Sequence, residues 1–262
     1  MNPKLMGVVN VTPDSFSDGG LFLEPEAAIV HGEELAREGA SILDVGGEST
    51  RPGAEEVSVE VELARTQPVV ADLAGLGHEI SIDTSKLAVA EAALDAGATI
   101  VNDVTALRAD PDIGALCGER GAGLVLMHMQ GTPRTMQEAP TYDDVVDEVR
   151  AFFAERSEVA VAAGVREDRI WLDPGIGFGK TLDHNLELLR RLDELGALGY
   201  PLVVGTSRKS FIGKIDGSET ADRIGGTIAS SVLAATRGAD VLRVHDVAAM
   251  AQAMQVAAAI VG

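Results

Sequence analysis

The chain of 262 residues is 46% hydrophobic and 24% charged, a composition typical of a globular protein. Its 41 acidic residues outnumber its 21 lysines and arginines, and the net charge of −20 argues against nucleic acid or an anionic membrane as a partner. No apolar run is long enough to cross a bilayer, the N-terminus carries no recognisable signal peptide, and the single cysteine, Cys117, excludes an internal disulfide, so we expect a cytoplasmic protein.

Eight short apolar runs alternate along the chain with helix-like segments. The runs are 5–12, 41–47, 79–85, 99–104, 123–128, 169–175, 200–207 and 240–246. Apolar residues at helical spacing are clearest at 25–40, 86–98, 142–164 and 184–195, and a last helix follows from 247. Parallel strands that are buried on both faces read as continuous apolar runs, so the alternation predicts an α/β fold, a TIM (β/α)8 barrel rather than an open sheet. No linker or shift of composition divides the chain, and we expect a single domain over 1–262.

Polar residues stand at the carboxyl ends of all eight predicted strands. In chain order they are Asn10, Asp44, Asp83, Asn102 with Asp103, His128, Asp173, Ser207 with Arg208 and Lys209, and Arg243 with His245. One such residue is usually a helix cap or a loop anchor, and we expect an ordinary strand-end hydrogen bond for Asp44. For His128, a core role and a ligand contact are equally open. In a barrel, however, all these ends meet at one mouth, so the whole set predicts a functional pocket.

The mixture of groups at that mouth indicates two kinds of ligand. Asp83, Asn102 and Asp173 suit a planar heterocycle with several N–H donors, because a carboxylate can accept two parallel hydrogen bonds. Lys209, Arg243 and His245 are cations suited to an anion, with phosphate or diphosphate first. Asn10 can offer an oxygen ligand to Mg²⁺ beside that phosphate.

Three loops have unusual compositions. Segments 12–20 and 47–54 follow the first two strands and are rich in Gly, Pro, Ser and Asp; the first carries Phe16 and the second Arg51. This composition is typical of lid loops that close over a site, and also of ordinary connections between a strand and a helix. The sixth strand ends in LDPGIGFGK (172–180), whose glycines indicate a close backbone approach to a ligand. This segment is neither a Walker A motif nor a dinucleotide fingerprint, and the chain has no zinc-ligand spacing and no GxSxG elbow.

Eight segments, in order and across the whole chain, closely resemble bacterial dihydropteroate synthases. They are MGVVNVTPDSFSDGG (6–20), DVGGESTRPGA (44–54), SIDTSK (81–86), VNDV (101–104), LMHMQGTP (126–133), LDPGIGFGKT (172–181), GTSRKSFIG (205–213) and RVHDV (243–247). The resemblance implies a TIM barrel, usually a homodimer, that acts as a transferase in folate biosynthesis. It implies that 4-aminobenzoate is joined to 6-hydroxymethyl-7,8-dihydropterin diphosphate, giving 7,8-dihydropteroate and diphosphate, and that sulfonamides compete with 4-aminobenzoate.

The resemblance also implies a role for each site residue. The pterin would contact Asp83, Asn102, Asp173, Lys209, Met127 and Gly205, with Asp173 at the 2-amino and N3–H edge. The diphosphate would contact Asn10, Thr50, Arg51, Arg243, Val244 and His245, with Mg²⁺ at Asn10. The 4-aminobenzoate site would comprise Phe16, Pro52, Phe178, Lys209 and Ser210. The expected catalytic residues are Lys209, Arg243, His245 and Arg51.

The family's reaction is dissociative: diphosphate leaves first, and the aniline nitrogen then traps the dihydropterin cation. Stabilisation of the leaving group and exclusion of water are therefore the expected tasks of the site. Two alternatives stay open, a pterin-binding methyltransferase barrel and an inactive pterin-binding paralogue. The segments TSRKS and RVH disfavour the first, and the retention of Lys209 and Arg243 disfavours the second. We expect Lys180 to anchor its loop and not to take part in the chemistry.

Overall fold

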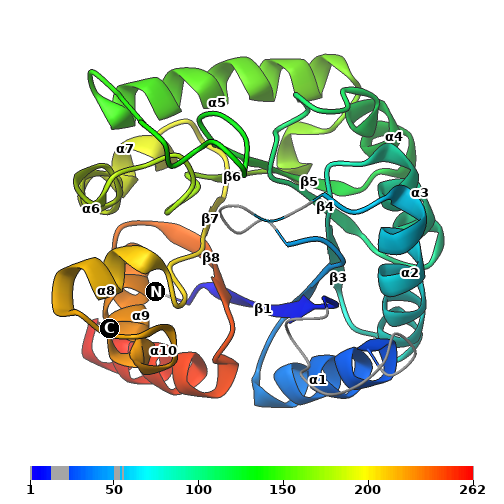
Figure 1. Cartoon of the computed structure of the whole chain (residues 1–262), viewed down its shortest axis with the longest axis horizontal. Helices are drawn as coiled ribbons and strands as arrows, with labels where there is room; N and C mark the ends of the chain where they lie inside the picture. Colours follow the sequence, from blue (N-terminus) through cyan, green and yellow to red (C-terminus); the bar gives the residue numbers. More distant parts are fainter. Residues whose placement is uncertain (1, 13–23, 50–53, 55, 262) are drawn as a thin grey trace.

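The computed structural model describes residues 2–12, 24–49, 54 and 56–261. Eight parallel strands form a closed barrel in sequence order, and β1 pairs with β8 to complete it. The strands are β1 (Lys4–Asn10), β2 (Ile42–Gly46), β3 (Ile80–Asp83), β4 (Ile100–Asp103), β5 (Gly123–Met127), β6 (Ile170–Asp173), β7 (Leu202–Val204) and β8 (Ala239–Val244). The predicted (β/α)8 barrel is confirmed, and Figure 1 shows the helices as a ring around the strands.

Helices follow the strands as the apolar spacing predicts. They are α1 (Glu24–Glu38), α2 (Val59–Gly75), α3 (Leu87–Asp95), α4 (Asp112–Arg120), α5 (Val145–Ala162), α6 (Leu182–Arg190), α7 (Leu192–Gly196), α8 (Ser210–Asp216), α9 (Ile224–Thr236) and α10 (Val247–Val261), with short 3₁₀ turns η2 (Glu167–Arg169) and η3 (Thr220–Asp222). Side-chain caps begin several of them: Ser58 accepts from the Val61 amide, and Asp144 accepts from the Val146 and Asp147 amides. Among the described residues, no helix is both long and apolar enough to cross a membrane.

The predicted helix over 184–195 is wrong in one respect, because it is two helices. The backbone of Arg191 leaves the helical region between α6 and α7, with φ −111° and ψ 28°. Its guanidinium is held by Asp144, 2.9 Å away at the start of α5, and by Glu194 at 2.7 Å. A tertiary ion pair thus accompanies the break, which the local apolar pattern does not reveal.

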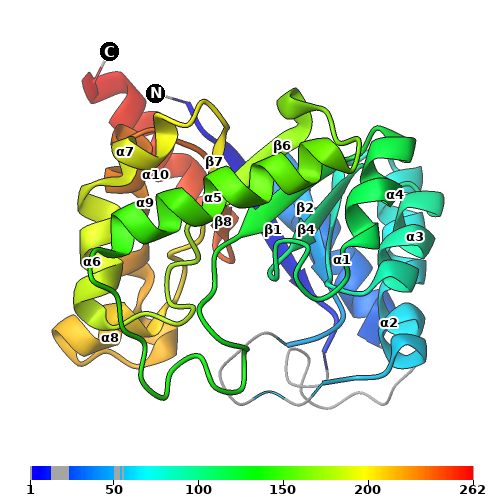
Figure 2. The same ribbon diagram turned by 90° about the horizontal axis from the view of Figure 1, so that it is seen from above.

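The strands end one to three residues before the predicted runs do. At these points the chain leaves the hydrogen-bonded ladder and turns toward the next helix, so polar residues that end a run become part of the mouth. Figure 2 shows both chain termini at the opposite end of the barrel, away from the connections that follow β5 and β6.

An apolar cluster fills the barrel interior and forms the floor of the mouth. Its buried members are Met6, Ile42, Ile100, Val125, Val203 and Val241, and Trp171 packs against them. Side chains two positions apart on a strand share a face. The residue two places after a floor residue therefore also points inward, one layer nearer the mouth. On six strands these residues are Asp44, Asn102, Met127, Asp173, Gly205 and Arg243.

Candidate active site

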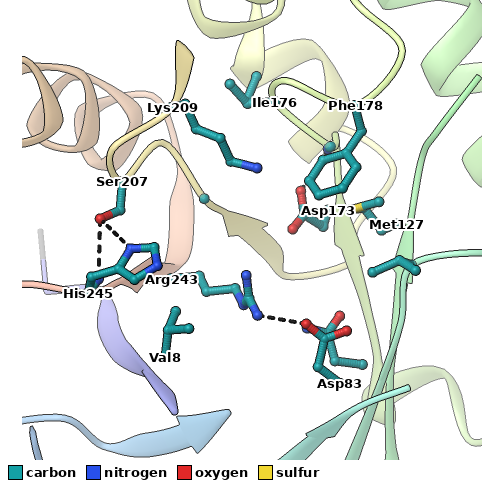
Figure 3. A pocket seen from close by; sticks show the side chains of 14 residues that line it. Val8, Asp83, Met127, Asp173, Ile176, Phe178, Ser207, Lys209, Arg243 and His245 are labelled. Atoms are coloured by element: carbon teal, nitrogen blue, oxygen red, sulfur yellow. Dashed lines mark hydrogen bonds and ion pairs between the residues drawn. The ribbon is translucent and has the colours of Figure 1, made fainter. Parts of the chain in front are cut away.

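A pocket at the carboxyl ends of the strands collects most of the predicted site residues. Its lining comprises Val8, Asp83, Asn102, Val104, Met127, Asp173, Gly175, Ile176, Phe178, Gly205, Ser207, Lys209, Arg243 and His245. Figure 3 shows the charged side chains facing one another across this cavity, from elements far apart in the sequence. All six residues that are predicted to contact the pterin belong to the lining of this pocket.

The remaining predicted residues fall into two groups. Asn10 is half-buried at the end of β1, Val244 is buried in β8, and Ser210 is exposed at the start of α8; these three do not line the pocket. The four others lie outside the described residues: Phe16, Thr50, Arg51 and Pro52.

One guanidinium holds two carboxylates at the floor of the pocket. Arg243 Nε donates to Asp44 Oδ2 at 2.6 Å, and its Nη2 donates to Asp83 Oδ2 at 2.7 Å. Asn102 Nδ2 donates to the same Asp44 oxygen at 3.2 Å. Burial would lower the pKa of Arg243, but the charges of Asp44 and Asp83 raise it. Burial raises the pKa of Asp83; Arg243 opposes this shift and Asp44 adds to it. The cluster fixes the directions of Arg243 and Asn102.

The prediction of an ordinary strand-end hydrogen bond for Asp44 is wrong. Asp44 is fully buried and forms an ion pair, so it is the acceptor on which two predicted site residues depend. A signal was present in the sequence, because Asp44 lies inside the apolar run ILDVG, where a carboxylate is costly without a partner. The partner itself, on the eighth strand, could not be identified from that run.

Asp173 ends β6 and points into the cavity (Figure 3). Its Oδ1 accepts from the Gly175 amide at 2.7 Å. Burial raises the pKa of Asp173, whereas the Gly175 amide and then Lys209 lower it. The carboxylate is thus held in place by its own loop and directed toward the space where a ligand would lie.

Two of the glycines after Asp173 approach protein backbone; Gly175 also lines the pocket, so the close approach to a ligand stays a prediction. Gly175 has φ +64°, and a Cβ there would lie 2.0 Å from the His128 carbonyl oxygen. Gly179 has φ +61°, and a Cβ there would lie 2.6 Å from the Gln130 carbonyl oxygen. The loop therefore packs directly on the chain that leaves β5, and only glycine fits at these two contacts.

Lys209 reaches into the pocket from the turn before α8. Its Nζ lies 4.0 Å from the centroid of the Phe178 ring, a cation–π contact. The preceding residue, Arg208, has φ 57°, an uncommon conformation for a non-glycine residue, and its guanidinium forms two hydrogen bonds to Asp246. Burial and then the charge of Arg243 lower the pKa of Lys209 to about 8, while Asp173 and Asp83 oppose that shift.

His245 is not the cation that the sequence predicts. Its Nδ1 lies 3.0 Å from Ser207 Oγ, and its backbone amide donates to the same oxygen at 3.2 Å. Burial and the neighbouring Arg243 lower the pKa of His245 to about 3, so the ring is neutral at neutral pH. Because Ser207 Oγ accepts from the amide, its proton can go to Nδ1, which leaves the ring proton on Nε2.

His128 has a core role. The ring packs edge-on against Phe152 with centroids 4.8 Å apart, and Nδ1 lies 3.0 Å from the Nζ of buried Lys180. Burial and then the charge of Lys180 lower the pKa of His128 to about 2. His128 does not line the pocket, so of the two open readings the structure favours the core one.

The described residues offer few protein ligands for a metal ion. Among the described residues no three His, Cys, Asp or Glu side chains cluster in a way that could hold a metal ion. Asn10 Oδ1 and Asp83 Oδ2 both lie beside Gly46, within 3.8–3.9 Å of where its Cβ would be. Mg²⁺ is commonly bound by one or two protein oxygens together with substrate phosphates, and Asn10 Oδ1 can supply one such oxygen; Asp83 Oδ2 already accepts from Arg243.

The barrel is closed, and its mouth combines acidic and amide acceptors with lysine and arginine. Over residues 6–245 the chain matches the family model described as pterin binding enzyme. The fold and the pocket thus define a pterin-binding enzyme. The dihydropteroate synthase of Neisseria meningitidis serogroup B is 50% identical over 260 residues, which cover 97% of this chain and 91% of that protein. The chain belongs to the dihydropteroate synthase family.

Solved structures agree with this assignment. The dihydropteroate synthase of Xanthomonas albilineans with 4-aminobenzoic acid is 48% identical, has a TM-score of 0.93, and is matched over 99% of this chain and 93% of its own. That of Yersinia pestis in a complex with a sulfonamide drug is 44% identical, with a TM-score of 0.93 and coverage of 98% and 94%. These relatives favour the synthase over the methyltransferase and the inactive paralogue.

Proposed function

We propose that the protein joins 4-aminobenzoate to 6-hydroxymethyl-7,8-dihydropterin diphosphate, forming 7,8-dihydropteroate and releasing diphosphate. The observation that carries the proposal is the convergence of Asp83, Asn102, Asp173, Lys209 and Arg243 on one pocket, in a chain of this family. The relatives' complexes with 4-aminobenzoic acid and a sulfonamide support the choice of second substrate and of inhibitor.

The pterin ring is assigned to the deepest part of the pocket. Asp173 accepts from the 2-amino and N3–H edge, for which its carboxylate already faces the cavity. Asn102 and Asp83 meet other ring nitrogens, Lys209 reaches the oxo side, and Met127 and Gly205 line the slot. Two nearby carboxylates also stabilise the positive ring that forms when diphosphate leaves.

The leaving diphosphate is assigned to Arg243 and His245. Arg243 is held by Asp44 and Asp83 through two of its N–H groups, so the others remain to meet an anion. His245 contributes a neutral N–H donor in place of a charge, because its pKa is lowered to about 3 by burial. Val244 lies between them, and Thr50 and Arg51 are expected to complete the grip.

Asn10, at the end of β1, is the proposed protein ligand of Mg²⁺. When bound, Mg²⁺ supplies positive charge to the departing diphosphate. Removal of divalent metal with EDTA is expected to stop diphosphate release, and added Mg²⁺ to restore it. Asn10→Ala is expected to raise the Mg²⁺ concentration for half-maximal rate about tenfold. The exposed Asn2, two residues before β1, is the matched control; equal Mg²⁺ dependence of both variants would contradict the role of Asn10.

4-Aminobenzoate is assigned to the outer part of the pocket. The Phe178 ring and Lys209 form one wall, Ser210 follows at the start of α8, and Phe16 and Pro52 are expected to close the site. We also propose a cytoplasmic location, since Cys117 is a free thiol, and a homodimer, which analytical ultracentrifugation would test.

The deciding experiment measures diphosphate release with both substrates and with each one omitted. The proposal expects release, and formation of dihydropteroate, only when both substrates are present. A sulfonamide should raise the apparent KM for 4-aminobenzoate and leave the maximal rate unchanged. A methyltransferase barrel would release no diphosphate, and an inactive paralogue would bind the pterin without turnover; either result would refute the proposal.

A further inference from the structure

We infer that Lys180 is a positioning residue that fixes Phe178 in the pocket and thereby sets the affinity for 4-aminobenzoate. The inference rests on the proposed function, because it assigns Phe178 to the wall of the second-substrate site. Lys180 itself is only 1% exposed and does not line the pocket, so it acts through Phe178 and not on a substrate.

The Lys180 ammonium joins two loops of the mouth. Its Nζ lies 3.0 Å from His128 Nδ1, 3.3 Å from the His128 carbonyl oxygen and 2.9 Å from the Phe178 carbonyl oxygen. Burial lowers the pKa of Lys180 to about 7, and the charge of Asp173 opposes that shift. In its protonated form the side chain has three N–H donors, and here three acceptors meet it. A buried charge is tolerated only with such partners, so the three bonds fix the position of the Nζ. Because two acceptors belong to His128, the carbonyl of Phe178 is tied to the end of β5.

The rest of the glycine-rich loop is held by bonds on either side of Phe178. Gly177 donates its N–H to Asn185 Oδ1 at 2.6 Å, and its carbonyl accepts from Gln137 Nε2 at 2.6 Å. The Gly179 carbonyl accepts from the Tyr142 hydroxyl at 2.8 Å. Lys180 donates to the carbonyl of Phe178, which lies between Gly177 and Gly179 and whose ring faces the pocket. The Phe178 amide also donates to the Gly175 carbonyl at 2.9 Å. Loss of the Lys180 bonds would therefore leave the Phe178 carbonyl without its partner and loosen the ring, while the loop remains attached through this amide and its neighbours.

The Phe178 ring depends on the peptide of that carbonyl for its contacts. It is half-buried and packs against an apolar cluster of Val104, Met127, Met129 and Met136. On its face lies Lys209 Nζ, 4.0 Å from the ring centroid. A small rotation of the peptide would move the ring away from Lys209, and a flat aromatic substrate that stacks there would lose one wall.

The test is Lys180→Met, which keeps an unbranched chain of similar length and removes all three donors. We expect the KM for 4-aminobenzoate to rise by up to about tenfold, the effect of losing one aromatic stacking contact. The KM for the pterin diphosphate should change much less, because Asp173 keeps its bond from Gly175. Lys214→Met, at an exposed lysine of α8, is the matched control and should leave both constants unchanged. An unchanged KM for 4-aminobenzoate in Lys180→Met, or an equal rise of both constants, would overturn the inference.

A double-mutant cycle with Phe178→Ala separates positioning from a general effect on structure. If Lys180 acts through Phe178, Lys180→Met should add little to the KM of the Phe178→Ala variant; additive effects would contradict the inference. Should Lys180→Met not fold, Lys180→Gln, which retains N–H donors, replaces it with the same expected direction. Absence of diphosphate release by the unmodified protein would refute the proposed function, whereas normal release with an unaffected Lys180→Met variant refutes only the positioning role.

Discussion

Replacement of Asp44 by asparagine tests whether the buried ion cluster organises the site. The substitution keeps the shape of the side chain and removes the charge that holds Arg243 Nε at 2.6 Å. It also places an amide opposite the Asn102 Nδ2 group, which now donates to Asp44 Oδ2. Both donors reach the same oxygen, so an amide oxygen in that position offers both only a neutral acceptor, and an amide nitrogen there offers neither an acceptor.

The expected loss of stability can be bounded from the geometry. Asp44 is 0% exposed and the Arg243 side chain 19%, so the pair is shielded from solvent. Removal of one partner of a buried pair costs about 3–5 kcal/mol. Arg243 retains Asp83 at 2.7 Å, which places the expected cost at the lower end, about 3 kcal/mol. In a domain of this size that corresponds to a fall in the unfolding temperature of roughly 6–12 °C.

Thermal unfolding followed by circular dichroism, with kcat/KM measured below the transition, is the assay. Asp168→Asn is the matched control, because Asp168 also forms two hydrogen bonds with an arginine, Arg166, but both side chains are more than half exposed. The control should unfold at the temperature of the unmodified protein, since exposed ion pairs contribute little. If Asp44→Asn unfolds at that temperature too and retains full kcat/KM, the cluster is not what fixes the site.

Three further predictions test other parts of the site. Arg243→Ala should lower the rate of diphosphate release on the order of 10²-fold, as expected for one preorganised charge-stabilising donor, and a loss under about threefold would count against its role. The rate should fall as the pH rises through about 8, because burial lowers the pKa of Lys209 to that value and its ammonium group loses a proton above it. The Lys209→Arg variant should lack this decline in rate. A decline that persists in the variant would show that another group titrates. Gly175→Ala should destabilise the fold by more than about 3 kcal/mol, since its Cβ would lie 2.0 Å from the His128 carbonyl oxygen. Gly217→Ala, at φ +78° with nothing within 4 Å, should cost only about 1 kcal/mol in urea unfolding, and similar costs at both glycines would refute the steric explanation.

The barrel could be predicted because its strands are buried on both faces and therefore appear as apolar runs. The same alternation that builds the floor from Ile42, Ile100 and Val241 also points Asp44, Asn102 and Arg243 toward the mouth. The polar side chains in the pocket lining therefore all come from predicted strand ends, although other strand-end residues, such as Asn10 and His128, lie outside it. What a run of residues cannot reveal is which of them pair across the barrel.

The errors share that cause. The partner of Asp44 lies 199 positions along the chain, and the break at Arg191 coincides with an ion pair to Asp144 on another helix. The neutral state of His245 depends on burial and on nearby Arg243, which no local pattern contains. Two glycines of the sixth loop, Gly175 and Gly179, lie against the backbone that follows β5, a contact between distant segments that no local pattern contains.

The seam between β1 and β8 has a consequence for how the protein is made. The ribosome delivers Asp44 and Asp83 early, and Arg243 arrives only with the last strand. Until then both carboxylates must stay hydrated, because enclosing them without a cation is costly. Pairing of β8 with β1 therefore closes the barrel and brings Arg243 to both carboxylates in the same step. A chain that ends before β8 would contain Asp83, Asn102 and Asp173 and would lack the cation that pairs with Asp44 and Asp83.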